Sequence, residues 1–226
     1  MGSQDEARGG LRVRAQLDRN AILTVATQLA ASGAPITIRA LGAELGADPT
    51  ALYRHFRTRD DLVQAIFDRL LTGIRERVDV TLPWRERLSE FAREFCRVCE
   101  EHPSVGAEVR SLITGGPGEL AAVEALLQAF RDAGLDRSDA VRFYAVFSDY
   151  LTSVGSTLAN YRLRAEGEVD LRDRAWLGDV GYVNDQEYPQ VAASRNELAA
   201  LRDHDIYQMG IGVILDAAES AGQSPQ

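Results

Sequence analysis

The apolar positions near the start of the chain recur with the period of an α-helix. Gly33 follows them at the place where a C-terminal cap is expected. The pattern predicts one amphipathic helix over about residues 19–32, with apolar positions at i, i+4, i+7 and i+8: Ile22, Ala26, Leu29 and Ala30.

A second helix is predicted to begin after Thr37, whose hydroxyl can accept a hydrogen bond from a first-turn amide. Ile36 and Leu41 occupy the two positions of a hydrophobic staple around this cap. Gly46 ends the helix after about two turns.

A third, short helix is predicted after Asp48, with Pro49 at its first position, where no amide is needed. Leu52 and Phe56 lie four residues apart and would bury one face. Two short helices joined by a glycine-containing turn, behind a longer first helix, indicate a helix-turn-helix. A plain three-helix packing unit has the same pattern.

The sequence pattern predicts further helices in the rest of the chain, so the expected fold is all-α. Proline and glycine mark the breaks between them. The long interval at 165–187 has no periodicity and is interpreted as a loop. The expected helices are 60–79, 84–101, 103–113, 119–133, 137–164, 188–202 and 205–220.

The charge is unevenly distributed. The net charge is −9, and all 25 basic residues are Arg. Up to Asp60 there are eight Arg and six acidic residues, a balance of +2, and the remainder carries −11. An acidic total argues against nucleic-acid binding, but a locally basic N-terminal part does not. No apolar run is long enough to span a bilayer, so a cytoplasmic protein is expected.

Several residues of the N-terminal part are placed to meet DNA. Thr50, Ala51 and Arg54 lie on the open face of the third helix, where they could read base edges. Thr58 and Asp61 form a capping box, so Arg59 stands at a helix N-terminus that attracts phosphate. The segment from Arg8 to Arg14, within an arm at 1–17, could follow the DNA backbone or enter the minor groove.

The stretch ITIRALGAELGADPTALYRHFRTRDDL, residues 36–62, resembles the DNA-binding domain of the tetracycline-repressor (TetR) family of bacterial transcription regulators. The resemblance covers about a fifth of the chain. It is carried by Thr37, Leu41, Ala43, Leu45 and Gly46, by the block from Leu52 to Phe56, and by Arg59 and Leu62.

This resemblance implies roles for individual residues. Arg39 would reach a base edge, although a phosphate contact or a plain surface position remains open. Tyr53 and His55 would contact the DNA backbone, although both could instead brace the helix packing. The implied partner is a double-stranded DNA operator. The expected DNA-binding set is Thr37, Arg39, Thr50, Ala51, Tyr53, Arg54, His55 and Arg59.

Aromatic residues recur on single helix faces farther along the chain. Such stripes are usually core, but members of the resembled family commonly bind small molecules among these helices. The expected effector-binding set is Phe91, Phe95, Arg110, Phe143, Phe147, Tyr150 and Trp176. The resemblance does not identify the effector.

Small and apolar residues gather on the long helix at 137–164 and on the last helix. In the resembled family these two helices pair with their symmetry mates, which implies a homodimer, whereas a monomer core is the alternative. The expected interface set is Leu151, Gly155, Leu158, Gly210, Val213, Ile214 and Ala217.

Cys96, Cys99 and His102 have a spacing that can bind a metal or undergo redox chemistry, but no second ligand pair completes a tetrahedral zinc site. Ordinary buried thiols fit better. No catalytic grouping and no phosphate-binding glycine loop are evident, so neither a cofactor nor an enzyme is expected.

Taken together, the expected organisation is an arm at 1–17, a helix-turn-helix domain at 18–59 and a helical effector-binding and dimerisation domain at 60–226. The function expected is a regulator, repressing until a small molecule releases it from a palindromic operator. The alternative is a helical ligand-binding or adaptor protein that keeps the fold without operator recognition.

Overall fold

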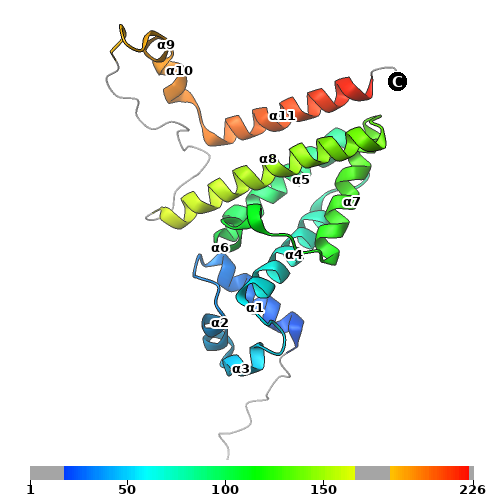
Figure 1. Ribbon diagram of the computed structural model, residues 1–226, viewed down its shortest axis with the longest axis vertical. Coiled ribbons are helices and arrows are strands. Elements are labelled where there is room, and N and C mark those ends of the chain that lie inside the picture. The colour runs from blue at the N-terminus through cyan, green and yellow to red at the C-terminus, as the bar shows by residue number, and fades with distance from the viewer. Residues whose placement is uncertain (1–17, 166–183, 224–226) are drawn as a thin grey trace, which may run out of the picture.

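The computed structural model describes residues 18–165 and 184–223, and these residues are helical with no strand (Figure 1). The all-α expectation is therefore confirmed. The helices are α1 (Arg19–Ala31), α2 (Ile38–Leu45), α3 (Pro49–Leu52), α4 (Arg59–Arg77), α5 (Trp84–Glu101), α6 (Pro103–Gly106), α7 (Pro117–Asp132), α8 (Arg137–Arg164), α9 (Pro189–Ala193), α10 (Arg195–Ala200) and α11 (Asp203–Gly222), with a 3₁₀ turn η1 (Val109–Ser111).

Helices α1 to α3 form the predicted helix-turn-helix, and their boundaries follow from local chemistry. The Thr37 hydroxyl accepts from the Ala40 amide at 3.0 Å, and the Asp48 carboxylate accepts from the Thr50 amide at 2.7 Å. Hydrogen bonds from the Thr50 side chain and amide lower the pKa of Asp48. Gly46 ends α2 in the left-handed region at φ 58°, which glycine adopts without strain.

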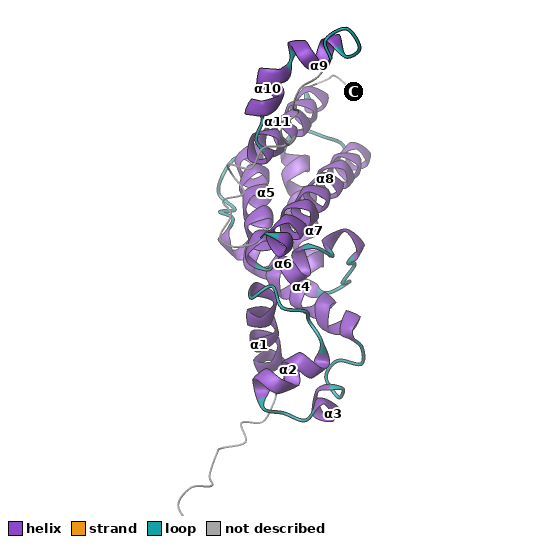
Figure 2. Cartoon of the chain, turned by 90° about the vertical axis from the view of Figure 1, so that its left-hand side faces the viewer, coloured by secondary structure: helices purple, strands orange, loops and turns teal. Residues whose placement is uncertain are grey.

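Helix α4 connects this unit to the rest of the molecule. Its start is the predicted capping box, in which the Asp61 amide donates to Thr58 at 3.0 Å and the Thr58 amide donates to Asp61 at 3.2 Å. One face of α4 carries buried Leu62, Ile66 and Ile74. Figure 2 shows α4 rising from the α1–α3 unit into the bundle formed with α5, α7 and α8.

The bundle core is built around aromatic rings. Phe130 of α7 is fully buried and meets Phe147 of α8 edge to face at 5.8 Å. Phe67 of α4 meets Phe95 of α5 in the same way at 6.4 Å. These rings join α7 to α8 and α4 to α5, and the packing of α4 on α7 and of α5 on α8 completes the bundle.

Two expected helices are each broken in the structure. The expected helix at 103–113 is replaced by α6 and η1, and the Ala107 carbonyl between them accepts a hydrogen bond from the Ser156 hydroxyl at 2.8 Å. The expected helix at 188–202 divides into α9 and α10 at Ser194, whose backbone lies at φ −99° and ψ 13°. The expected loop at 165–187 falls largely outside the described residues.

The last helix, α11, lies along α8 (Figure 1). Tyr150 of α8 stacks on Tyr207 of α11 with ring centroids 5.9 Å apart, and the Tyr207 hydroxyl donates to the Ala92 carbonyl at 2.7 Å. Among the helices in the described ranges, none is long and apolar enough to cross a membrane.

Candidate DNA-binding surface and effector site

The outer end of the helix-turn-helix carries polar side chains that face solvent. Arg39 in the first turn of α2 and Thr50 in α3 are exposed, and Tyr53 is 53% exposed. Arg54 is exposed beside them, whereas Ala51 is half-buried. Neither arginine side chain has a hydrogen bond or ion pair to any residue that the structure describes. We call Arg39, Thr50, Tyr53 and Arg54 the outer face.

The third helix is shorter than expected. It ends at Leu52, so Tyr53, Arg54 and His55 lie in the turns that follow it. Arg19 of α1 holds these turns in place, because its Nη1 donates to the His55 carbonyl at 2.9 Å and its guanidinium lies 4.5 Å from the centre of the Phe56 ring. Sequence reasoning missed this positioning role of Arg19.

Arg59 is exposed at the start of α4, but its guanidinium is also hydrogen-bonded within the protein. Its Nε donates to the Ile36 carbonyl at 3.0 Å, and its two terminal nitrogens donate to the Glu108 carboxylate at 2.9 and 2.5 Å. The hydrogen bonds to Glu108 raise the pKa of Arg59. A phosphate contact from this guanidinium would have to displace Glu108. The structure therefore gives Arg59 a fastening role between the helix-turn-helix and the α6–η1 segment.

A second hydrogen bond joins the same two regions. The Ser104 hydroxyl of α6 donates to the Ala34 carbonyl at 2.8 Å. Ser104 is one of the few buried polar residues among those the structure describes. The helix-turn-helix is thus fastened on its inner side while its outer face stays open.

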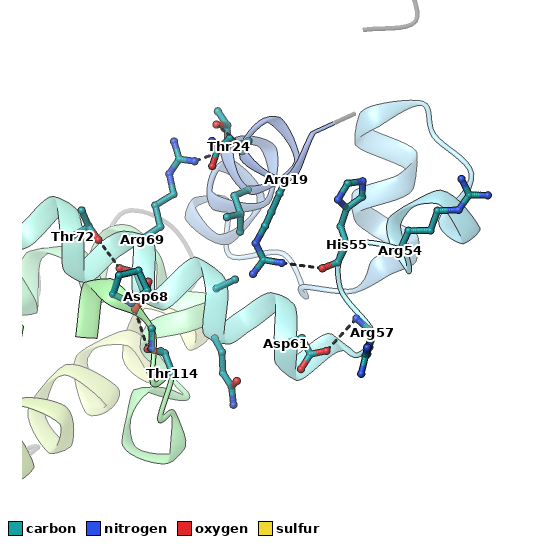
Figure 3. A pocket seen from close by; sticks show the side chains of 16 residues that line it. Arg19, Thr24, Arg54, His55, Arg57, Asp61, Asp68, Arg69, Thr72 and Thr114 are labelled. Carbon is teal, nitrogen blue, oxygen red and sulfur yellow. Dashed lines mark hydrogen bonds between the residues drawn. The ribbon is translucent and has the colours of Figure 1, made fainter. Parts of the chain in front are cut away.

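A wide polar cleft of about 1000 Å³ lies beside the helix-turn-helix, between α1, the turns after α3 and α4 (Figure 3). Four arginines line the cleft: Arg19, Arg54, Arg57 and Arg69. Arg69 donates to the Asn20 carbonyl at 3.4 Å. Effector sites are usually enclosed and apolar, and this cleft is neither.

Asp68, at the middle of α4, binds the start of α7. Its carboxylate accepts from the Thr114 hydroxyl at 3.0 Å and from the Glu119 and Gly118 amides at 2.9 and 3.2 Å; Figure 3 shows the Thr114 contact. A Cβ atom at Gly118 would collide with the Asp68 carbonyl oxygen. We call this arrangement the Asp68 latch. The sequence indicated only a break at Gly115–Gly118.

An inner cavity of about 120 Å³ lies among α4, α5, α7 and α8. Phe91 and Phe95 of the expected effector set line it. Sequence reasoning missed Tyr144, Ser148 and Thr152, which also line it and which lie four residues apart on one face of α8. Their four-residue spacing in the sequence places them on one face of a helix. The expected set was chosen by its aromatic residues, which lie on the neighbouring face.

The other expected effector residues lie elsewhere. Phe143 and Phe147 pack on Phe130 in the core, because their face of α8 meets α7 at that ring. Tyr150 donates to the Ile206 carbonyl at 3.2 Å and so joins α8 to α11. Arg110 lies outside the cavity and donates to the Ser153 hydroxyl at 2.6 Å. Trp176, the last member of the expected set, lies outside the described residues.

An outer groove of about 390 Å³ adjoins the inner cavity. It lies between the end of α4, the start of α5 and α7, and Phe91 and Leu126 line both hollows. Arg75 and Arg87 stand on its lining. Arg87 forms an ion pair with Asp132, yet its Nε is buried without a hydrogen-bond partner in the described structure.

The expected interface residues of α8 and α11 separate into two groups. Leu151 and Leu158 are buried within the chain, and a Cβ at Gly155 would lie 2.8 Å from the Cys99 sulfur. Gly210 abuts the Tyr150 hydroxyl. These four positions serve packing inside the protomer, because they lie on the faces turned toward α5 and toward each other. Val213 and Ala217 are exposed, and Ile214 is half-buried.

The two cysteines are buried and free. Burial raises the pKa of Cys96 to about 12 and raises that of Cys99 well above its ordinary value, which disfavours the reactive thiolate. In the described part of the chain, no group of three or more His, Cys, Asp or Glu could hold a metal ion.

Comparison with known proteins agrees with this architecture. Residues 22–66 match the family described as "Bacterial regulatory proteins, tetR family", and residues 81–220 match "Tetracyclin repressor-like, C-terminal domain". A curated "HTH-type transcriptional regulator" of Saccharopolyspora erythraea is 29% identical over 159 residues, which cover 70% of this chain and 66% of that protein. The chain therefore spans slightly less than two thirds of that relative's length.

Two further relatives show the range of the similarity. The "HTH-type transcriptional repressor DrrR1" of Streptomyces coeruleorubidus is 28% identical over 190 residues, covering 81% of this chain and 70% of that protein. The structure of the protein ActR from Streptomyces coelicolor in complex with actinorhodin superposes with a TM-score of 0.76 at 19% identity, covering 93% of this chain and 100% of that one. At that identity the similarity shows the fold alone.

Proposed function

Since this chain belongs to the TetR family of bacterial regulators, we propose that it is a sequence-specific repressor that a small-molecule effector releases from a palindromic operator. The observation that carries the proposal is the outer face, where Arg39 and Arg54 have no partner among the described residues, whereas nearby Arg19 and Arg59 donate hydrogen bonds to His55 and Glu108. An adaptor that had lost operator recognition would not require arginine at these two positions of the motif.

The residues of the outer face suit complementary tasks on DNA. A guanidinium reads guanine through two parallel hydrogen bonds, and the Thr50 methyl suits contact with a thymine methyl. The Tyr53 hydroxyl suits a phosphate oxygen, which fixes position without reading sequence. The Thr37 hydroxyl accepts from the Ala40 amide, and its own hydrogen is available to a phosphate.

A homodimer would present two such faces. The side of α8 and α11 turned away from the bundle exposes Val146, Met209 and Val213 by 57%, 63% and 62%, beside a groove of about 770 Å³. Exposed apolar side chains gathered in this way favour association with a partner surface. A two-fold axis here would place the outer faces about one turn of DNA apart, roughly 34–36 Å, and would require a palindromic operator.

Release by an effector requires a link between the inner cavity and the helix-turn-helix. Glu119 of α7 lines the inner cavity and also accepts from the Thr114 amide at 2.8 Å, so it belongs to the turn that Asp68 binds. A shift of α7 would therefore move α4, whose first residue, Arg59, binds the Ile36 carbonyl. The effector must bind the released arrangement more tightly than the DNA-bound one.

The proposal is tested by selecting duplexes from a random or genomic pool with the full chain and measuring affinity by gel shift. We expect a palindromic sequence to be enriched. Arg54→Ala should weaken binding about 5- to 150-fold, the equivalent of roughly 1–3 kcal/mol for one base contact. Arg137→Ala removes an exposed arginine from the start of α8 and should change affinity less than two-fold, about 0.4 kcal/mol.

The competing adaptor role makes the opposite forecast. It predicts no enriched duplex, and equal behaviour of the Arg54 and Arg137 variants. Either result, obtained with protein whose circular dichroism shows intact helices, would end the operator proposal.

A further inference from the structure

The inner cavity and the outer groove are neighbouring hollows with a common wall. Phe91 of α5 and Leu126 of α7 line both, and these side chains are 4% and 6% exposed. The inner cavity alone, at about 120 Å³, has room for about four water molecules at roughly 30 Å³ each. It is too small for an ordinary ligand unless the wall moves.

The inner cavity offers rings and hydroxyl groups. Phe67 and Phe95 present an edge-to-face pair, and Tyr144, Ser148 and Thr152 of α8 add polar atoms. The Thr152 hydroxyl donates to the Ser148 carbonyl at 3.0 Å, so it has lone pairs rather than a hydrogen to offer a ligand. No arginine lines this cavity.

The outer groove has a different character. Ala121, Ala125 and Ala129 recur every fourth residue on α7 and give it a flat apolar side. Arg75 and Arg87 line it as well, together with the acidic side chain of Glu124. The groove thus combines a surface that suits a planar ring with a net positive charge.

Arg87 supplies the independent observation. Its side chain is 17% exposed and one terminal nitrogen binds Asp132, but its buried Nε has no hydrogen-bond partner in the described structure. A buried N–H without an acceptor is unfavourable, and most such groups in proteins are paired. Arg87 lines the groove, so a ligand oxygen there would provide the missing acceptor once the side chain shifts to bring its buried Nε to the groove.

We propose that the outer groove and the inner cavity are two halves of one effector site, which takes an elongated, planar, mainly apolar molecule with a carboxylate at one end. The carboxylate binds Arg87, the rings lie along the alanine side of α7, and the far end displaces Phe91 and Leu126 to enter the inner cavity. Removal of the wall joins spaces of about 120 and 390 Å³ into one of roughly 500 Å³, within the usual range for small-molecule sites. This assignment rests on the proposed function, whose effector it describes.

The charge requirement is tested by calorimetric titration of the full chain with three naphthalene probes of similar size: 2-naphthoate, 2-naphthamide and 2-naphthylmethylammonium. We expect 2-naphthoate to bind at least 10-fold more tightly than the ammonium probe. Arg87→Gln should weaken 2-naphthoate at least 10-fold and leave the ammonium probe within two-fold. The matched control Arg85→Gln removes an arginine of the same helix that pairs with Asp216 outside the groove, and it should leave all three affinities within two-fold.

The location is tested by filling each half. Ala125→Trp should abolish binding of 2-naphthoate, whereas Ala199→Trp, on an exposed position of α10, should not. The longer probe 6-phenyl-2-naphthoate must enter the inner cavity. Ser148→Leu should therefore weaken it at least five-fold while leaving 2-naphthoate within two-fold.

The proposal is overturned if 2-naphthoate fails to bind, if the Arg87 and Arg85 variants behave alike, or if Ser148→Leu affects both carboxylate probes equally. These titrations contain no DNA, so their failure is separate from failure of the operator proposal. Probe binding that follows the expected pattern in a protein that selects no duplex supports this site and contradicts the regulator function instead.

Discussion

The two sides of the helix-turn-helix unit differ in how their polar groups are used. On the outer face, Arg54 has no hydrogen-bonding or ionic partner among the described residues. Arg59 lies five residues later, on the inner side. Its guanidinium donates hydrogen bonds to the Glu108 carboxylate and to the Ile36 carbonyl. Both residues belong to the basic N-terminal part of the chain. Positive charge near a DNA-binding helix is therefore insufficient evidence of DNA contact. Whether an arginine is available to DNA depends on the hydrogen bonds and ion pairs that it makes within the protein.

This difference predicts two classes of variant. Substitutions in the inner contacts should lower the free energy of unfolding, and substitutions on the outer face should change DNA affinity alone. The largest effect is expected at the Asp68 latch. In Gly118→Ala the new Cβ would collide with the backbone carbonyl oxygen of Asp68, which cannot turn aside as a side chain could. The free energy of unfolding should fall by about 3 kcal/mol, in the upper range for overpacking. Urea unfolding followed by circular dichroism measures it.

A glycine of α4 provides the control for this variant. At Gly73 the nearest atom to a new Cβ is the flexible end of Arg77, at 3.3 Å. Gly73→Ala should leave stability unchanged or raise it by up to about 1 kcal/mol through helix propensity. Equal losses in the two variants would show that the latch is not tightly packed.

Substitutions in the ion pair between Arg59 and Glu108 are expected to have a smaller effect. Arg59→Ala and Glu108→Gln should each lower the free energy of unfolding by about 1 kcal/mol, since the pair is partly exposed and exposed ion pairs contribute little. The double variant should lose much less than the sum of the single losses, because both substitutions remove the same contact. Full additivity would mean that Arg59 and Glu108 act independently and would reopen a phosphate role for Arg59.

The sequence predicted the features that depend on neighbours within a few residues. The caps at Thr37, Asp48 and Thr58 each involve a partner two or three positions away, and all three are present. Helix bounds such as those of α5 and α8 follow from the same local rules.

Contacts between distant residues could not be predicted in this way. Glu108 is 49 residues from Arg59, and no local pattern pairs them. The same holds for Ser156 and Ala107, which are also 49 residues apart. For the candidate effector site, periodicity showed that α8 is amphipathic but could not say which side meets Phe130 and which meets the cavity. The outer face was accessible to sequence reasoning because the motif that builds it is local.

Salt dependence sharpens the comparison further. DNA affinity of the parent protein should fall steeply with ionic strength, because each arginine on a phosphate releases counterions. If Arg39 contacts a phosphate, Arg39→Ala should reduce the slope of log affinity against log salt by about 0.9. Arg59→Ala should leave that slope unchanged even where it weakens binding. A reduced slope in the Arg59 variant would move Arg59 to the outer, DNA-contacting group.

The smallest effect is expected from a fastening contact far from the DNA. Glu94 of α5 binds Arg97 at 2.6 Å and Arg77 of α4 at 2.5 Å, and its pKa is lowered chiefly by the hydrogen bond from Arg97. The folded-state pKa lies below the unfolded value of about 4.5, so the contribution of Glu94 to stability is present above that pH and is lost as the pH falls through the folded-state pKa.

Glu94→Gln should therefore lower the free energy of unfolding at pH 7 by less than about 1 kcal/mol, and the difference from the parent should shrink as the pH falls below 4.5. Glu86→Gln removes an exposed carboxylate of the same helix without an ion pair to any described residue, and it should show no such convergence. Unfolding titrations at several pH values measure both differences. A Glu94 difference that stays constant down to pH 3 would mean that the side chain contributes by packing across α4 and α5, rather than by its charge.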